Sequence, residues 1–392
     1  MEADALSQLI ARPGSADLEE SSPGAYVVVL HKGPTWNLAD IEPFCRLLSR
    51  RFAGEVWAFG SYQADQHIGR VRLRVVGSRP FREFANGMQF FRAALSRVEH
   101  LRAVRPSGLA FVSLDPFTGG LLGLYAAWRA RGVLICEING VYGSRHNTAG
   151  TRMALLRSLR VLARRGVAAF VLHRATAVRL LFADQLAGFV RLPERTVTRQ
   201  FFETTDLAAF NPGAEEPIIL AVGHPFRIKG FDLLCQAFKQ VADQYPEWRL
   251  VLIGHGAPEA VQEGGLGHPR IETYPGVKQS RVAEWMARCA IFALPSRTEG
   301  MGRVLLEAAA AGKCRLGTRV DGIPTVIEDG ADGMLVDPES IDQLAAALDR
   351  LMAEAGLRRR LGEAARQRVE REFSEGAYLD HYGELVAAAL RA

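Results

Sequence analysis

The sequence predicts an α/β protein built from two doubly wound, Rossmann-like domains that face a cleft. Short apolar or β-branched runs alternate with stretches of helical periodicity along most of the chain. This pattern is typical of parallel sheets that are covered by helices on both faces. The alternation occurs in two series, and two such series indicate two domains. The length of 392 residues also exceeds what one hydrophobic core of ordinary size needs.

The first series supplies the strands and helices of the first domain. Short apolar runs predict strands at Tyr26–Leu30, Glu55–Phe59, Val71–Val76, Leu109–Leu114, Val133–Ile138 and Val167–Leu172. Helical periodicity predicts helices at Phe81–His100 and Gly120–Arg131. Because the strands are apolar on both faces, we expect them to form one buried parallel sheet.

The second series repeats the pattern. It predicts strands at Ile218–Val222, Arg249–Ile253, Arg270–Thr273, Ile291–Leu294 and Met334–Val336. It predicts helices at Phe231–Gln244, Ser280–Cys289 and Val304–Ala311. Beyond Ile341 we expect helix almost to the end, with a break at Phe373–Gly376 before a last helix at about Ala377–Ala389.

Segments rich in turn-forming and charged residues set the predicted domain boundaries. Residues 211–217 contain turn residues, charge and two prolines, so they separate the two series. Residues 1–22 are polar and acidic and are predicted to be a disordered tail. We therefore expect a first domain at residues 23–212, a second at 213–372 and a C-terminal helix at 373–392.

Composition excludes several classes of protein. Apolar residues make up 48% and charged residues 23% of the chain, as in globular rather than disordered or fibrous proteins. The longest charge-free apolar stretch, Phe117–Trp128, is too short to span a bilayer. No signal-peptide pattern is visible, so we expect a cytoplasmic protein. The cysteines form no C-x-x-C pair and the histidines lack metal-ligand spacing, so we expect no disulfide and no metal.

Arginines crowd the first half of the chain, although the net charge is only +5. A basic half is suited to anionic lipid, nucleic acid or a phosphorylated substrate, and a solvated basic face is the alternative. A helix expected at Thr151–Arg165 has arginines beside a face that carries Leu155, Leu156, Leu159 and Leu162. Such a helix suits peripheral contact with an anionic membrane. Packing of these leucines on the sheet is the alternative.

The segment with the most chemical information is Leu294–Gly312. A strand leads into a polar, glycine-punctuated loop that carries Glu299, and a helix that carries Glu307 follows. Two carboxylates at this spacing are able to accept hydrogen bonds from hydroxyls at different parts of one elongated ligand. The helix start near Arg303 offers free N–H groups to a phosphate between them. The alternative is a helix-entry residue at Glu299 and a surface ion pair at Glu307.

Two further segments follow predicted strands. Val222–Gly230 places Arg227 and Lys229 beside a glycine turn, and cations there suit a diphosphate. A basic surface turn is the alternative. Gly254 and Gly256 form a Gly-His-Gly string that lacks the third glycine of the dinucleotide fingerprint, so it does not indicate an NAD site. A simple tight turn is the alternative there.

Together these segments resemble glycosyltransferase family 4, the retaining enzymes with the two-domain B-type glycosyltransferase fold. Gly223–Gly230 matches the spacing of the family's Gly-Arg-Leu-x-x-x-Lys-Gly string, and Gly254–Gly256 matches its Gly-x-Gly. The most specific family string is Pro-Ser-x-x-Glu-Gly-Phe-Gly-x-x-x-x-Glu-Ala. It is matched here by Pro295, Ser296, Glu299, Gly300, Gly302, Glu307 and Ala308.

The resemblance implies roles for single residues. Glu299 would contact the donor sugar, Glu307 the nucleotide ribose, and Lys229 the leaving diphosphate; these roles, with Arg227 as a second cation, make Glu299, Lys229 and Arg227 the catalytic candidates. The expected donor-binding residues are Gly33, Gly223, His224, Lys229, Gly254, Val277, Glu299, Gly300, Met301, Gly302, Arg303 and Glu307. The second domain would hold the donor, and the first would hold the acceptor.

The sequence departs from the family pattern at several positions. His224 stands where the family has an arginine, and Met301 stands where it has a phenylalanine. In the first domain the family's glycine pair is reduced to Gly33 and a proline, and a frequent histidine is replaced by Asn139. We expect Glu137 and Asn139 to bind the acceptor. Turn residues that close a strand are the alternative.

The function that follows is transfer of a sugar, with retained configuration, from a nucleoside-diphosphate sugar to an acceptor hydroxyl. The resemblance implies a saccharide or lipid-linked acceptor in polysaccharide, lipopolysaccharide or other glycoconjugate assembly. It implies no metal, no other cofactor and no nucleic acid, and a place in the cytoplasm or at the inner face of the membrane. A sugar-nucleotide epimerase or phosphorylase on the same architecture is one alternative. A non-catalytic nucleotide-sugar-binding relative is the other.

Overall fold

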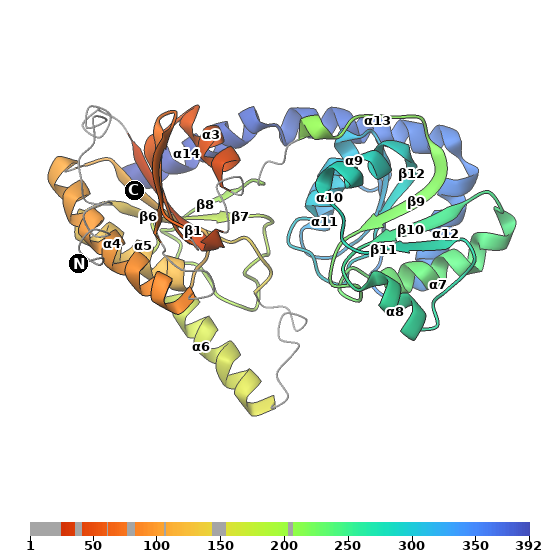
Figure 1. Ribbon diagram of the computed structural model, residues 1–392, viewed down its shortest axis with the longest axis horizontal. Helices are drawn as coiled ribbons and strands as arrows, with labels where there is room; N and C mark the ends of the chain where they lie inside the picture. Colours follow the sequence, from red (N-terminus) through yellow and green to blue (C-terminus); the bar gives the residue numbers. More distant parts are fainter. Residues whose placement is uncertain are drawn as a thin grey trace. The chain divides into compact units, whose positions relative to one another are not determined.

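A computed structural model describes residues 25–35, 41–60, 62–76, 83–105, 107–142, 154–202 and 207–392. The chain divides into two units, each built around its own sheet (Figure 1). Unit 1 comprises residues 1–139, 150–201 and 379–392, and unit 2 comprises residues 140–149 and 202–378. The tail predicted at residues 1–22 lies outside the described part of the chain.

Unit 1 contains a mostly parallel sheet in the order β3-β4-β2-β1-β5-β6-β7-β8. Its strands are β1 (Tyr26–Thr35), β2 (Ala53–Gly60), β3 (Ala64–Ile68), β4 (Val71–Val76), β5 (Leu109–Ser113), β6 (Val133–Glu137), β7 (Ala177–Leu180) and β8 (Val197–Gln200). The chain starts in the middle at β1 and winds outwards in both directions, and among the described strands only the edge strand β3 runs antiparallel to its neighbour. This arrangement is a doubly wound sheet.

Helices cover the sheet of unit 1. They are α3 (Glu42–Ser49), α4 (Glu83–Val104), α5 (Thr118–Ala130), α6 (Ala154–Leu172) and most of α14 (Glu375–Arg391). Helix α4 packs on α5, and α5 packs on α6. The end of the chain completes this unit, because Tyr382 and Leu385 of α14 are fully buried and the Tyr382 ring lies 5.7 Å from the ring of Phe52.

Unit 2 contains an all-parallel sheet in the order β11-β10-β9-β12-β13-β14. Its strands are β9 (Glu216–Val222), β10 (Arg249–Ile253), β11 (Ile271–Tyr274), β12 (Cys289–Leu294), β13 (Cys314–Thr318) and β14 (Met334–Val336). In chain order this is 3-2-1-4-5-6, the order of a dinucleotide-binding Rossmann sheet. The direction of winding reverses between β9 and β12, which lie side by side.

The helices of unit 2 form two layers. They are α7 (Phe231–Val241), α8 (Ala257–Glu263), α9 (Gln279–Arg288), α10 (Arg303–Ala310), α11 (Ile323–Val326), α12 (Ile341–Ala353) and α13 (Ala355–Glu372). Helix α12 packs on α7, whereas α10 packs on both α9 and α13. Every residue of β12 is buried between these layers, so the apolar run that predicts this strand also explains its central position.

The prediction of a strand at Val167–Leu172 is wrong, because this run is the end of helix α6. Ala168, Val171 and Leu172 are buried, whereas Phe170 is 47% exposed. The buried positions are spaced by three and four residues, which is the spacing of one helix face. A short apolar run without charges has no periodicity that separates a strand from a buried helix.

The sequence does not predict four of the strands, namely β3, β7, β8 and β13. Strand β13 shows why a buried strand escapes detection. Arg315 is the second residue of this strand and is 1% exposed. Its guanidinium pairs with Asp332 at 2.8 Å and donates a hydrogen bond to the carbonyl of Val326 at 2.7 Å. A charged residue with buried partners interrupts the apolar pattern without ending the strand.

A buried ion network joins β2, β4 and α4 in unit 1. Glu55 is fully buried, and its carboxylate lies 2.9 Å from Arg74 Nε and accepts a 2.9 Å hydrogen bond from Arg97 Nε. The indole of Trp57 donates a further hydrogen bond to it at 2.6 Å. Burial alone raises the pKa of Glu55, but the charges of Arg97 and Arg74 outweigh it and lower the pKa to about 2. The carboxylate is therefore held in its charged form.

Candidate functional site

The loops that follow β9 and β12 form the candidate site of unit 2. The two strands are neighbours and parallel, so their carboxyl ends meet at one edge of the sheet. In open α/β sheets ligands bind outside the carboxyl ends of the strands, where the winding reverses. The loop after β9 carries Lys229, and the loop after β12 carries Glu299. The structure thus brings these two predicted residues together at the point where the fold places a ligand.

Lys229 and Glu299 form an ion pair at this edge. Lys229 Nζ lies 2.5 Å from Glu299 Oε2. The side chains are 17% and 12% exposed, so both charges stay within reach of a ligand while solvent is partly excluded. Ser296 Oγ donates a longer hydrogen bond, 3.3 Å, to the same carboxylate oxygen. A carboxylate and an ammonium so placed suit sugar hydroxyls and phosphate oxygens respectively.

Glycines allow the loops around this pair to approach each other closely. Gly230 has a φ of +69°, and a Cβ built there would lie 1.9 Å from the carbonyl oxygen of Pro295. A Cβ at Gly254 would lie 2.1 Å from the carbonyl oxygen of Gly223. The side chain of Lys229 packs over Gly223, at 3.1 Å from the position of an added Cβ. Because these glycines lack a Cβ, the backbones of the loops after β9, β10 and β12 are able to pack against each other.

Arg297, which no sequence motif singles out, links the two loops to each other. Its backbone N–H donates to the carbonyl of Ile228 at 2.8 Å, one residue before Lys229. Its guanidinium makes paired hydrogen bonds to Asp232, at 2.7 and 3.0 Å, and to Glu339, at 2.5 and 3.0 Å. The side chain is 11% exposed. Bidentate pairs of this kind fix geometry as well as charge, so Arg297 holds the Lys229 loop beside the Glu299 loop.

Asp321 fixes the backbone of Glu299, and it is also absent from the sequence predictions. Its Oδ2 accepts hydrogen bonds from the N–H of Glu299 at 2.9 Å and from Thr298 Oγ1 at 2.5 Å. The next residue, Gly322, donates its N–H to the carbonyl of Glu299 at 3.2 Å. Asp321 has a φ of +44°, a conformation that side chains other than Asn and Asp seldom adopt. Asp321 follows β13, a strand that the sequence does not predict, so the apolar pattern gives no signal that points to it.

Helix α10 begins where the sequence predicts it. Gly302 caps it with a φ of +73°, and Arg303 is its first, exposed residue. Glu307 lies in the second turn and is only 7% exposed. Met301 is 5% exposed, so its side chain belongs to the packing beneath the loop rather than to an open surface.

The other predicted donor residues lie on neighbouring loops. His224 is exposed, and its Nδ1 lies 3.1 Å from the carbonyl oxygen of His255 in the β10 loop. Val277 is half-buried after β11. Arg227 is 83% exposed and lies 4.0 Å from its nearest carboxylate, Asp232. Its side chain is therefore free to reorient, unlike that of Lys229.

The predicted residues of unit 1 lie on other strand ends. Glu137 is 2% exposed, and its carboxylate lies 2.9 Å from Arg179 Nη2. The same guanidinium donates to Asn139 Oδ1, while Asn139 Nδ2 donates to the carbonyl of Leu114 at 3.3 Å. Asn139 is half-buried, so it is the more accessible of the two acceptor candidates. Gly33 lies within strand β1 and not in a loop after it, because β1 continues to Thr35 past a register shift.

No group of three or more His, Cys, Asp or Glu side chains is placed to hold a metal ion in the described part of the chain. No described helix combines the length and apolar character that crossing a bilayer requires.

Residues 203–368 match the family model described as glycosyl transferases group 1. Over 181 residues the chain is 34% identical to a D-inositol 3-phosphate glycosyltransferase of Xylanimonas cellulosilytica, covering 43% of each chain. Over 189 residues it is 28% identical to the lipopolysaccharide core biosynthesis glycosyltransferase LpsE of Rhizobium meliloti, covering 47% of this chain and 53% of that one. The chain thus spans about half the length of the curated relatives it matches.

Solved structures resemble nearly the whole chain. HepE of Anabaena, in complex with UDP and glucose, has a TM-score of 0.68 and 16% identity over 93% of this chain and 100% of that chain. Sucrose-phosphate synthase of Thermosynechococcus elongatus has a TM-score of 0.67 and 20% identity over 93% and 98%. At these identities the likeness establishes the fold alone, and it confirms the predicted two-domain B-type glycosyltransferase architecture.

The matched residues, 203–368, cover β9 to β14 and contain both loops of the Lys229–Glu299 pair. The resemblance predicted from the sequence motifs is therefore confirmed for this part of the chain. Residues 203–368, which make up most of unit 2, are thus similar to the glycosyl transferases group 1 family.

Proposed function

We propose that the protein is a glycosyltransferase that moves a sugar from a nucleoside-diphosphate sugar to an acceptor hydroxyl. The observation that carries the proposal is the Lys229–Glu299 pair at the point where the winding of unit 2 reverses. The ammonium group of Lys229 suits the phosphate end of a sugar diphosphate, and the carboxylate of Glu299 suits the hydroxyls of its sugar end. Both side chains are partly shielded from solvent. The similarity of residues 203–368 to the glycosyl transferases group 1 family supports the same reading.

In the proposed reaction the bond between the anomeric carbon and the diphosphate oxygen breaks. A new bond forms from the acceptor oxygen to the same carbon, and the acceptor proton passes to the leaving diphosphate. We propose that configuration is retained, because a same-face route needs no separate general base. Lys229, with Arg227 as a mobile second cation, would stabilise the leaving group. Glu299 would orient the sugar, and Glu307 would bind the ribose.

We propose further that the acceptor binds unit 1 near Asn139, since Glu137 is committed to Arg179. A saccharide or a lipid-linked saccharide fits this proposal. The reaction as proposed uses no resident metal, because the cations of the protein carry the leaving-group charge. Nucleic acid has no part in it.

Helix α6 supports a proposal that the protein works at a membrane surface. Residues 161–166 are all exposed, and Leu162 is 67% exposed. Arg164 is also exposed, and its guanidinium lies 4.5 Å from the ring centre of Phe117. An exposed apolar side chain flanked by arginines suits an anionic bilayer. The protein would then act at the cytoplasmic face of the membrane.

A thermal-shift screen against UDP-, GDP-, ADP- and dTDP-sugars tests the donor site. UDP-glucose comes first, because HepE is a structural neighbour solved with UDP-glucose bound. A donor at a hundredfold excess over Kd should stabilise the fold by about 2.7 kcal/mol. Glu307→Ala and Glu307→Gln should lose most of the shift, whereas the exposed control Glu328→Ala should keep it. A folded protein that responds to no nucleotide sugar would overturn the proposal.

Acceptor dependence separates the transferase from its alternatives. A transferase releases nucleoside diphosphate faster when an acceptor is added. An epimerase converts the sugar nucleotide without an acceptor, and a non-catalytic relative binds the donor but releases nothing under either condition.

A further inference from the structure

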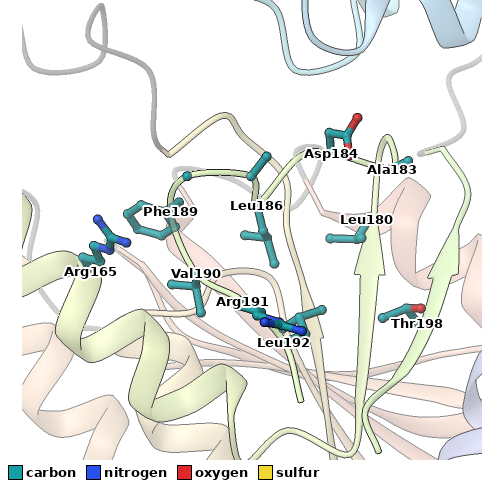
Figure 2. A pocket seen from close by; sticks show the side chains of 12 residues that line it. Arg165, Leu180, Ala183, Asp184, Leu186, Phe189, Val190, Arg191, Leu192 and Thr198 are labelled. Atoms are coloured by element: carbon teal, nitrogen blue, oxygen red, sulfur yellow. The ribbon is translucent and has the colours of Figure 1, made fainter. Parts of the chain in front are cut away.

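Unit 1 contains a groove of about 490 Å³ beside strand β7 (Figure 2), which we name the β7 groove. It is lined by Leu180 at the end of β7, Thr198 of β8, Arg165 of α6 and residues 183, 184 and 186–192 of the loop after β7. None of the residues expected to bind the donor or the acceptor lies among them. The volume is within the range of sites that bind small organic molecules.

The lining of the groove combines apolar side chains with three charged ones, Arg165, Asp184 and Arg191. Leu186, Phe189 and Val190 are buried and present carbon to it. Figure 2 places Arg165 beside Phe189 at one end and Asp184 at the other. Within the described residues Arg165 has no ion-pair partner, so its charge is available to a ligand. Apolar side chains with the cations Arg165 and Arg191 among them match an amphiphile with an anionic head.

The loop of the groove is fastened to the strand end that carries the proposed acceptor residue. Gln185 is 4% exposed, and its Oε1 accepts from the N–H of Leu181 at 2.6 Å. Its Nε2 donates to the carbonyl of Ile138 at 2.8 Å. Ile138 directly precedes Asn139 in the sequence. The side chain of Gln185 therefore links the β7 groove to the strand end that carries Asn139, the proposed acceptor residue.

Helix α6 supplies the wall of the groove and is exposed where it leaves the unit. Arg165 lies in the run of exposed residues 161–166, three positions after Leu162. A molecule that enters along this helix meets apolar side chains and guanidinium groups together. These groups complement an anionic membrane, whose acyl chains are apolar and whose headgroups carry negative charge.

We propose that the β7 groove binds the phosphate-bearing end of a lipid-linked acceptor. The first carbons of the lipid chain lie on Leu186, Phe189 and Val190, and the phosphate pairs with Arg165. The inference rests on the proposed function, because it names the acceptor class of the same reaction. Free phosphate is the weaker ligand, since it gains nothing from the apolar side chains.

Titration calorimetry with farnesyl phosphate tests the groove without any nucleotide sugar. Wild-type protein should bind farnesyl phosphate more tightly than farnesol, and inorganic phosphate should give no signal in the same range. Ala187→Trp fills the groove from an exposed lining position and should weaken binding by at least about 20-fold, whereas the control Ala187→Ser should change it by less than about twofold. Arg165→Gln should weaken farnesyl phosphate by about tenfold, or about 1.4 kcal/mol, and leave farnesol unchanged.

Equal binding of farnesyl phosphate to wild type and a folded Ala187→Trp would overturn the inference. Equal loss of farnesol and farnesyl phosphate in Arg165→Gln would overturn the role of Arg165. The donor screen reports separately on unit 2, because it contains no lipid. A protein that responds to a nucleotide sugar but does not bind farnesyl phosphate would refute the groove and leave the transferase proposal intact. A protein that binds farnesyl phosphate but responds to no nucleotide sugar would refute the transferase proposal and, with it, the acceptor role of the groove.

Discussion

Lys229 Nζ and Glu299 Oε2 lie 2.5 Å apart, although the two residues belong to loops on opposite sides of the point where the winding reverses. In this arrangement each charge is neutralised by the other. A diphosphate that binds Lys229 competes with the carboxylate for the same ammonium group. In the proposed reaction the donor diphosphate would therefore replace Glu299 as the partner of Lys229, instead of binding to an unpaired cation.

The competition predicts opposite effects of Glu299→Gln on binding and on turnover. Without the carboxylate charge Lys229 is free for the diphosphate, so UDP should bind at least as tightly as to wild type. Turnover should fall by about 10²- to 10³-fold, as for the loss of one preorganised polar contact in an active site. Equilibrium titration with UDP and steady-state rates measure the two effects. Weaker UDP binding in the folded variant would contradict the competition.

Substitution of Asp321 tests whether the backbone of Glu299 needs a fixed position. Asp321→Gly keeps the positive φ without strain but removes the acceptor of the Glu299 N–H. Its kcat should fall by about 10- to 100-fold, because small displacements of reacting groups are costly. Asp321→Asn keeps an acceptor oxygen and tolerates this φ, so it should recover most of the rate. Equal kcat in both variants would exclude a positioning role.

The network around Glu55 predicts how stability depends on acid. The pKa of Glu55 is lowered from 4.5 to about 2 in the fold. Its contribution to stability is therefore complete above pH 4.5 and is lost as the pH falls from 4.5 to 2. Glu55→Gln leaves Arg74 and Arg97 buried without the carboxylate and should cost about 3–5 kcal/mol at neutral pH. Its denaturation midpoint should also change less than that of wild type between pH 4.5 and 2.

The matched control for this measurement is Glu42→Gln. Glu42 pairs with the exposed Arg46 one helical turn away, and such surface pairs contribute less than about 1 kcal/mol. Urea unfolding of the three proteins across the pH range distinguishes a local electrostatic effect from a general loss of stability. A Glu55→Gln protein as stable as Glu42→Gln would show that the network contributes little.

The exposed end of α6 predicts binding to anionic vesicles. Leu162→Asp removes an exposed apolar side chain and adds a negative charge beside Arg164 and Arg165. Cosedimentation with vesicles rich in phosphatidylglycerol should weaken by about tenfold, and binding should decrease with salt. Gln262→Asp adds the same charge at an exposed position of unit 2 and should bind as wild type does. Absence of cosedimentation of the wild-type protein with these vesicles at low salt would refute the membrane proposal.

Metal removal tests the proposed charge stabilisation by protein cations alone. Dialysis against EDTA should leave the transfer rate within about twofold, since Lys229 and Arg227 carry the leaving-group charge in the proposal. A rate that falls with EDTA and returns with Mg²⁺ would assign part of that charge to a metal.

Much of the fold was predictable from apolar runs because the central strands of both sheets are buried on both faces. The runs at Val71–Val76 and Arg249–Ile253 coincide with β4 and β10. The failures occur where burial and residue type diverge. Strand β13 is not predicted because Arg315 interrupts its apolar run, and the partner that neutralises this charge, Asp332, lies outside the strand. The run at Val167–Leu172 is as apolar as a buried strand, but in the structure it is part of helix α6, which packs on α5. The local sequence does not reveal this packing.

The candidate site was predictable where a residue type alone carries chemistry. Glu299 and Lys229 stand out as charges at strand ends, and the structure brings them together. Arg297 and Asp321 escaped because their roles depend on partners, namely Asp232, Glu339 and the backbone of Glu299. Spacing along the chain contains no information about such contacts between loops.

Helix α14 has a consequence for how the protein is made. Unit 1 begins near the N-terminus, yet its core includes Tyr382, Leu385 and Val386. Domains generally fold from the N-terminus as synthesis proceeds, but this unit lacks part of its interior until the ribosome has passed Val386. Unit 2, which ends at Tyr378, has by then been translated in full. The later half of the chain is thus the first that is able to complete its core during biosynthesis.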